Sequence, residues 1–280
     1  MREIESSTII EDVSRACIEA NNDIGEDMVR IFQEAFEKEE SESGKDVLRQ
    51  LIENAKIAKE EWLPYCQDTG FAVFFVELGQ DVHIKGATLE QAINEGVRRG
   101  YKEGYLRASI VSDPLRRKNT GDNTPAIIHI RIVEGDRLKI TMAAKGGGSE
   151  NMSRIAMLKP SDGKIGVENF VVDTVSSAGP NACPPLVVGV GIGGTMEMAT
   201  ILAKKAAVRA IGSRNLDPYY AAMEEELEER CNRLGVGPMG LGGRITVLKI
   251  NIETHPCHIA SLPVAVNINC HAARHKEIVL

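Results

Sequence analysis

The sequence has no apolar run of the about 18 residues that a membrane-spanning helix needs. It begins with the acidic segment MREIESSTIIEDV, whereas a secretory signal begins with basic and then apolar residues. It also has no block of Lys and Arg with interleaved aromatic residues, and its 40 acidic residues outnumber its 33 basic ones. We therefore expect a cytoplasmic protein with neither a membrane nor a nucleic acid as a partner.

Internal repeats and low-complexity linkers are absent as well, and 280 residues with 43% hydrophobic content can bury a large core. The order of helical and β-rich patterns predicts a single α/β domain over residues 1–280, with mixed sheets and flanking helices. Apolar residues recur at helical spacing in three stretches between residues 6 and 60. Residues 1–61 are therefore expected to form a helical cap within that domain.

Several β-rich runs follow the helical segment. Residues 126–133 and 137–143 have apolar strand patterns joined by Glu134, Gly135 and Asp136, which predicts a β-hairpin. Residues 146–158 are interpreted as a glycine loop leading into a helix, and residues 165–175 as another strand. The run SLPVAVNINC predicts a strand that ends at Cys270.

The six cysteines lie in two kinds of context. In a cytoplasmic protein they should be thiols or metal ligands, because disulfides are rare there. Cys17 and Cys231 lie within helical patterns, where a free cysteine usually behaves as a small buried hydrophobe. Three others lie in loops or at a strand end, beside glycine, proline or polar residues: Cys66, Cys183 and Cys270.

Three thiolates can hold a [4Fe-4S] cluster and leave one iron open to water or substrate. The open iron would act as a Lewis acid on a bound hydroxyl and carboxylate. Three dispersed cysteines are more often separate buried thiols, so the local contexts carry this interpretation. An electron carrier would favour a fourth ligand, for which only Cys257 is near, and a cluster-bearing sensor would need a nucleic-acid module that the sequence lacks.

Polar motifs surround these cysteines. In CQDTG, Asp68 could exchange a proton with a group bound at the cluster while Gln67 orients it, although Asp-Thr-Gly also makes ordinary turns. KGGGSEN, residues 145–151, combines backbone N–H groups with a cation, which suits an anionic oxygen or a tight turn. Among the cations of residues 105–129, an arginine such as Arg107 could clamp a carboxylate, although most such cations are simply solvated.

Two further features leave alternatives open. Residues 189–194 match the G-x-G-x-x-G pattern of dinucleotide binding, but the following helix ends near Gly212 and runs into another helix where a second parallel strand would be required. These glycines could instead bring the backbone close to a cluster or substrate. His258 lies in a loop before a strand and His271 beside Cys270; a lone histidine is more often structural than catalytic, and position alone does not assign either role.

Six motifs occur in a fixed order along the chain: CQDTG at 66–70, RASIVSDPL at 107–115, NTGDNTPAIIH at 119–129, KGGGSENMS at 145–153, ACPPLVVGVGIGG at 182–194 and LPVAVNINC at 262–270. Together they resemble the α subunit of class I fumarate hydratases, and the related tartrate dehydratases share the pattern. The resemblance runs from about residue 5 to the C-terminus. It implies reversible hydration of fumarate to (S)-malate, with tartrate dehydration as the alternative.

The resemblance implies a role for individual residues. It places the [4Fe-4S] cluster on Cys66, Cys183 and Cys270, and a small dicarboxylate substrate on the open iron. Gln67 and Asp68 would contact this substrate, with Asp68 as the acid toward the departing hydroxyl.

The resemblance also implies that Arg107 clamps a carboxylate and that Gly147 or Gly148 contacts the substrate. A substrate-binding histidine of the family lies twelve residues before the third cysteine, which corresponds to His258 here. Single-chain members continue into a second domain that supplies further arginines, a lysine and the base, whereas this sequence ends ten residues after Cys270. We therefore expect a separate β subunit, an α2β2 assembly and no activity from the chain alone.

Overall fold

A computed structural model describes residues 2–280 of the chain. Two units, each with its own sheet and hydrophobic core, share these residues: one comprises residues 2–24, Lys56–Gly147 and Arg274–Leu280, and the other Gly25–Ala55 and Gly148–Ala273. The predicted α/β class, with mixed sheets, flanking helices and an N-terminal helical segment, is confirmed. The sequence alone suggests one domain with a cap at residues 1–61. In the structure these N-terminal residues are divided between the two units.

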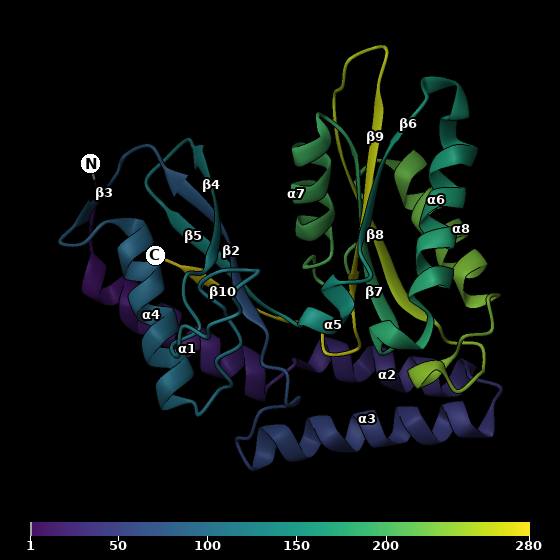
Figure 1. Ribbon diagram of the computed structural model, residues 1–280, viewed down its shortest axis with the longest axis horizontal. Helices are drawn as coiled ribbons and strands as arrows, with labels where there is room; N and C mark the ends of the chain where they lie inside the picture. The colour runs from purple at the N-terminus through teal and green to yellow at the C-terminus, as the bar shows by residue number, and fades with distance from the viewer. Residues whose placement is uncertain (1) are drawn as a thin grey trace. The chain divides into compact units, whose positions relative to one another are not determined.

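The first unit has a four-stranded sheet in the order β10-β5-β2-β4, and its helices α1 and α4 lie side by side against this sheet (Figure 1). A separate two-stranded sheet pairs β1 with β3 in parallel. Alternate residues of β2, among them Phe74 and Val76, point into the core with the apolar faces of α1 and α4. The bounds are β1 Arg2–Glu5, α1 Ser6–Asn22, β2 Phe71–Gly79, β3 Val82–Lys85, α4 Leu89–Glu103, β4 Ile127–Val133, β5 Leu138–Lys145 and β10 Arg274–Val279.

The predicted hairpin of residues 126–143 is wrong, although both of its strands exist. β2 lies between them, parallel to β4 and antiparallel to β5. The end of β2 fits there because the Gly79 N–H donates to the Arg137 carbonyl at 2.8 Å and Gln80 N–H to the Val133 carbonyl at 2.8 Å. A side chain at residue 79 would collide with the Gly135 carbonyl oxygen, only 2.5 Å from an added Cβ. The turn signal was correct locally, but it says nothing about insertion of a third strand.

The second unit has a four-stranded sheet in the order β6-β9-β7-β8, with α7 on one face and α6 and α8 on the other (Figure 1). β7 runs parallel to β8 and antiparallel to β9. The bounds are α2 Glu26–Lys38, β6 Arg154–Leu158, η1 Pro160–Asp162, α6 Gly163–Ala178, η2 Gly179–Ala182, β7 Leu186–Gly193, α7 Met196–Ala206, α8 Pro218–Asn232, η3 Pro238–Gly240, β8 Val247–His255 and β9 Leu262–Asn269. Helix α3, Glu42–Glu60, begins in this unit, and its last residues belong to the first unit. Helix α5, Gly147–Glu150, does the reverse, because only Gly147 belongs to the first unit.

Two predictions for the second unit are wrong. Residues 165–175 form part of α6 where a strand was predicted, because Val167, Val171 and Val175 recur every four residues on its buried face. Residues 154–158 form β6 where a helix was predicted, since only the single turn α5 follows the glycine loop.

Candidate active site

The CQDTG turn of the first unit holds the carboxylate of Asp68 in a fixed orientation. Its Oδ1 accepts a hydrogen bond from the Gly70 N–H at 2.9 Å, and its Oδ2 accepts one from the Gly147 N–H at 2.9 Å. Cys66 and Asp68 are half-buried, whereas Gln67 is exposed. The structure therefore brings together Asp68 and one of the two glycines predicted to contact a substrate.

Gly70 allows the CQDTG turn to lie close to the backbone of Lys145 at the end of β5. Its φ of +71° lies in the left-handed region, and an added Cβ would lie 2.5 Å from the carbonyl oxygen of Lys145. The next residue, Phe71, pairs with Lys145 at the end of β5, so the turn lies directly against the start of the KGGG loop. Lys145 itself is buried.

A polar network ties Arg107 to the same turn. The Thr69 hydroxyl accepts a hydrogen bond from the Arg107 N–H at 2.9 Å and donates one to the Arg107 carbonyl at 3.1 Å. The side chain of Arg107 is exposed. The Asn123 amide donates to the Gly70 carbonyl at 3.2 Å, so the predicted NTGDN motif also reaches this turn.

Tyr101 of α4 supports the turn from within the core. Its hydroxyl donates to the Thr69 carbonyl at 2.9 Å, and burial raises the pKa of Tyr101, which keeps the hydroxyl protonated. Sequence reasoning missed Tyr101, because an aromatic residue on the apolar face of a helix looks like ordinary core.

Arg274 is a second residue that sequence reasoning missed. It is 2% exposed, and its Nη1 donates to the Asn21 side-chain oxygen at 2.9 Å. A Cβ added to Gly146 would lie 3.1 Å from Asp68 Oδ2 and 3.9 Å from Arg274 Nη2, so the cation and the carboxylate converge on this glycine. The only signal in the sequence was its position four residues after Cys270.

Cys183 and Cys270 lie at one end of the sheet in the second unit. Cys183 follows η2 and precedes β7, whereas Cys270 directly follows β9, whose Asn269 pairs with Val187 of β7. The Cys183 carbonyl accepts a hydrogen bond from the His271 N–H at 3.3 Å, which joins the two loops. Both thiols are half-buried.

The remaining cysteines are unlike these. Burial raises the pKa of Cys17 and of Cys231 to about 12, which agrees with their predicted role as buried hydrophobes. Cys257 is exposed on a loop. None of the six forms a disulfide. Cys66 belongs to one unit and the other two candidates to the second, and within residues 2–280 no three His, Cys, Asp or Glu side chains are arranged to hold a metal ion.

His258 lies at the opposite end of β9 from Cys270. It belongs to the exposed loop that connects β8 to β9 (Figure 1). Its Nδ1 accepts a hydrogen bond from the Ala260 N–H at 3.1 Å. The intervening strand has eight residues, a length of about 27 Å. The structure therefore does not bring His258 to Cys183 and Cys270 within one chain. It places His258 in a pocket of about 350 Å³ with Lys164 and Tyr220.

The glycine run 189–194 serves the packing of α7 on β7. An added Cβ would lie 2.0 Å from the Ala203 carbonyl oxygen at Gly189 and 2.0 Å from the Ala199 carbonyl oxygen at Gly191. This close contact with α7 is a physical reason for Gly189 and Gly191, whereas an added Cβ at Gly193 would lie 1.9 Å from the His255 carbonyl oxygen of β8. After α7 the chain passes through α8 before it returns to β8, which is parallel to β7, so two helices stand where a dinucleotide-binding unit has one.

Comparison with known families agrees with the motifs. The sequence profile of the family described as fumarate hydratase (fumerase) matches residues 10–279. The chain belongs to the fumarate hydratase family. Membership of this family makes the chain part of a hydro-lyase.

Named relatives of this fumarate hydratase family member cover most of its length. A protein of Methanocaldococcus jannaschii that carries the provisional name L(+)-tartrate dehydratase subunit alpha is 47% identical over 256 residues, 89% of each chain. The L(+)-tartrate dehydratase subunit alpha of Escherichia coli strain K12 is 36% identical over 252 residues, 89% of this chain and 83% of its own. Within residues 2–280, no helix has the length and hydropathy to cross a membrane.

Proposed function

We propose that the chain is the iron-sulfur α subunit of a hydro-lyase that hydrates fumarate reversibly to (S)-malate. The observation that carries this proposal is the Asp68 carboxylate, held by the N–H groups of Gly70 and Gly147 two residues after Cys66 and tied through Thr69 to Arg107. A dicarboxylate hydro-lyase needs a proton-transferring group and a cation at fixed positions.

The cluster ligands proposed are Cys66, Cys183 and Cys270. The donor set fits, because these thiols are half-buried at loop ends and are therefore accessible without being fully solvated. Three thiolates leave one iron of a [4Fe-4S] cluster open, and this iron, when the cluster is bound, supplies a Lewis acid for a hydroxyl and a carboxylate.

Side chains and backbone groups of this chain would transfer a proton and bind the substrate. Asp68 handles the proton of the departing or attacking hydroxyl, and the exposed Gln67 orients the substrate beside it. The exposed guanidinium of Arg107 binds a carboxylate bidentately. The Gly147 N–H already donates to Asp68, which favours the Gly148 N–H as the donor to the substrate.

His258 would act from another copy of the chain. A substrate near Cys183 and Cys270 is beyond its reach in the same chain, because β9 lies between them. Mixing the β-subunit complex of a Cys270→Ser chain with that of a His258→Ala chain should then restore part of the activity that each complex lacks. Two inactive parents that give an inactive mixture, despite confirmed subunit exchange, would contradict this assignment.

A separate β subunit would supply the base that removes the carbon-bound proton. The named relatives are themselves alpha subunits, which supports a heteromer, and α2β2 is the assembly we propose. The purified chain alone should have no hydro-lyase activity. Activity without a partner would contradict this part of the proposal.

Dehydration of L(+)-tartrate is the second candidate, and the names of the relatives favour it. (S)-Malate and L(+)-tartrate differ by one hydroxyl at the reacting carbons. Co-expression with the β subunit, followed by measurement of kcat/KM for fumarate, (S)-malate and L(+)-tartrate, decides between them. No turnover of any of the three by an iron-loaded complex would refute the hydro-lyase proposal on this substrate class.

A further inference from the structure

Glu39 is a buried carboxylate at the junction of α2 and α3. It is 2% exposed, and four backbone N–H groups donate to it. Two belong to its own turn: Oε1 accepts from Glu40 at 2.8 Å and from Ser41 at 2.9 Å. The other two are about 200 residues away in the sequence: Oε1 accepts from Arg244 at 2.8 Å and Oε2 from Ile245 at 2.8 Å.

The charge of Glu39 is therefore satisfied entirely by the backbone. Burial alone would raise the pKa of Glu39, but the hydrogen bonds from Arg244, Ile245, Ser41 and Glu40 outweigh burial and hold that pKa below its ordinary value. Such charge-assisted bonds are stronger than neutral ones. They anchor the end of the glycine-rich loop of residues 235–243, because Arg244 and Ile245 directly follow it.

The loop is closed at its base and lies against the residues that flank Cys183. Its base is closed by the Gly242 N–H, which donates to the Val236 carbonyl at 2.9 Å. From its tip, the Met239 N–H donates to the Pro184 carbonyl at 2.7 Å. Gly240 touches Pro180 so closely that an added Cβ would lie 2.3 Å from the Pro180 Cβ.

Cys183 needs this support, because it has φ +53° and ψ +65°, a left-handed conformation that costs energy in a residue with a side chain. Its N–H donates to the Pro180 carbonyl at 3.1 Å. Three residues later the Leu186 N–H donates to the Thr246 carbonyl at 2.9 Å, directly after the segment that Glu39 anchors. The loop and its anchor thus hold both sides of the Cys183 turn.

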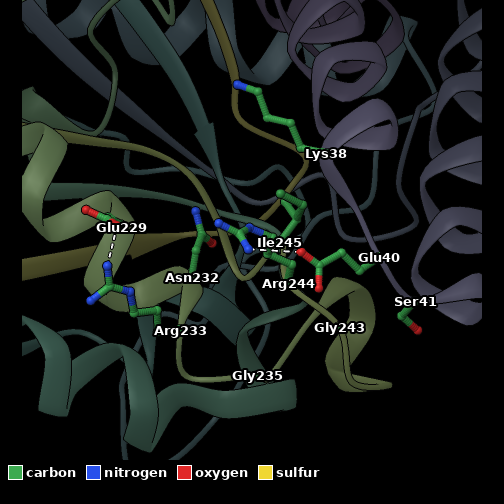
Figure 2. Close-up of a pocket in the computed structure, with 10 residues that line it drawn as sticks. All are labelled: Lys38, Glu40, Ser41, Glu229, Asn232, Arg233, Gly235, Gly243, Arg244 and Ile245. Atoms are coloured by element: carbon green, nitrogen blue, oxygen red, sulfur yellow. Dashed lines mark hydrogen bonds and ion pairs between the residues drawn. The ribbon is translucent and has the colours of Figure 1, made fainter.

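We infer that Glu39 is a positioning residue for Cys183: through the loop of residues 235–243 it fixes the turn that presents this thiol. The inference rests on the proposed function only in taking Cys183 as a cluster ligand. Glu40, Arg244 and Ile245 line a pocket of about 890 Å³ whose lining residues are drawn in Figure 2. There Glu40 pairs with the Arg244 side chain at 3.0 Å. Glu40 is the matched control. Its exposed carboxylate binds the Arg244 side chain, whereas the Glu39 carboxylate binds the Arg244 backbone N–H.

The test measures alkylation of each cysteine by iodoacetamide in the cluster-free, reduced chain, followed by peptide mass spectrometry. Glu39→Gln replaces one acceptor oxygen by an NH2 group that faces N–H donors. We expect the rate at Cys183, relative to the exposed Cys257, to rise about tenfold as the turn opens locally. Glu40→Gln should leave the ratio unchanged. An unchanged Cys183 ratio in Glu39→Gln, with Cys17 still protected, overturns the inference.

A second pair of variants keeps the test decisive if Glu39→Gln unfolds, which alkylation of the buried Cys17 would reveal. Gly240→Ala and Gly235→Ala carry similar backbone strain, with φ +76° and +71°, but only residue 240 has Pro180 in its way. A faster reaction of Cys183 in Gly240→Ala alone supports the inference, and equal rates overturn it. Failure of the wild-type chain to bind iron on anaerobic reconstitution would refute the cluster on Cys183 while leaving these alkylation results intact.

Discussion

Gly189→Ala should strongly destabilise the protein, because β7 and α7 approach one another through this position. The added Cβ would lie 2.0 Å from the Ala203 carbonyl oxygen, 2.4 Å from the Ala207 nitrogen and 2.9 Å from the Ala207 Cβ. Two of these three are backbone atoms, which cannot rotate away, so α7 would have to move by more than about 1 Å to restore ordinary contact. Overpacking typically costs about 1–3 kcal/mol, and we expect the upper end of this range or more.

Urea unfolding monitored by circular dichroism provides the measurement, with Gly212→Ala as the control. The nearest atom to a Cβ at Gly212 is Arg30 Nη2 at 3.6 Å, at the end of a flexible side chain. This control should change the free energy of unfolding by no more than about 0.5 kcal/mol. If Gly189→Ala unfolds at the same urea concentration as the wild type, the close packing of α7 on β7 is refuted.

Three further outcomes are expected. Asp68→Asn should abolish turnover by the complex and cost about 1–3 kcal/mol of stability, because its amide must face the Gly70 or Gly147 N–H; wild-type turnover would rule out its proton-transfer role. Because the pKa of Glu39 is lowered on folding, its stabilisation is complete above the ordinary glutamate pKa of about 4.3 and is lost as the pH falls through the lowered value. The wild type and Glu40→Gln should therefore lose stability between neutral and acid pH more steeply than Glu39→Gln, which lacks this carboxylate. An identical dependence of the unfolding free energy on pH in all three proteins would exclude this linkage. Cys17 and Cys231, with pKa values raised to about 12, should resist alkylation at pH 8, and rapid labelling of either in the folded chain would contradict their burial.

Local patterns predicted much of the fold. The helical spacing before residue 60 predicted helices that the structure contains, and the strand predicted to end at Cys270 is β9, which ends at Asn269. The sheet order was not predictable in this way. Insertion of β2 between β4 and β5 depends on contacts of Gly79 with residues more than 50 positions away, and no turn signal encodes them.

In the candidate site, too, local contacts were predictable from the sequence and long-range contacts were not. The CQDTG turn was recognisable because Asp68 and Gly70 act within three residues of one another. Tyr101 and Glu39 were not, because their hydrogen bonds join segments 32 and more than 200 residues apart. A motif thus identifies the residues proposed to contact a ligand, whereas the residues that hold the motif in shape emerge only from the folded chain.

The proposed function depends on a cluster that Cys66, Cys183 and Cys270 would hold, with one open iron for the substrate. Mössbauer spectroscopy of the complex, reconstituted anaerobically with iron-57 and sulfide, tests it most directly before and after addition of (S)-malate or L(+)-tartrate. We expect a cluster in the wild type and in Cys257→Ser, and a substrate-dependent change at a single iron. We expect no cluster when Cys66, Cys183 or Cys270 is replaced by serine. A cluster retained in all the variants, or a spectrum indifferent to both substrates, would contradict it.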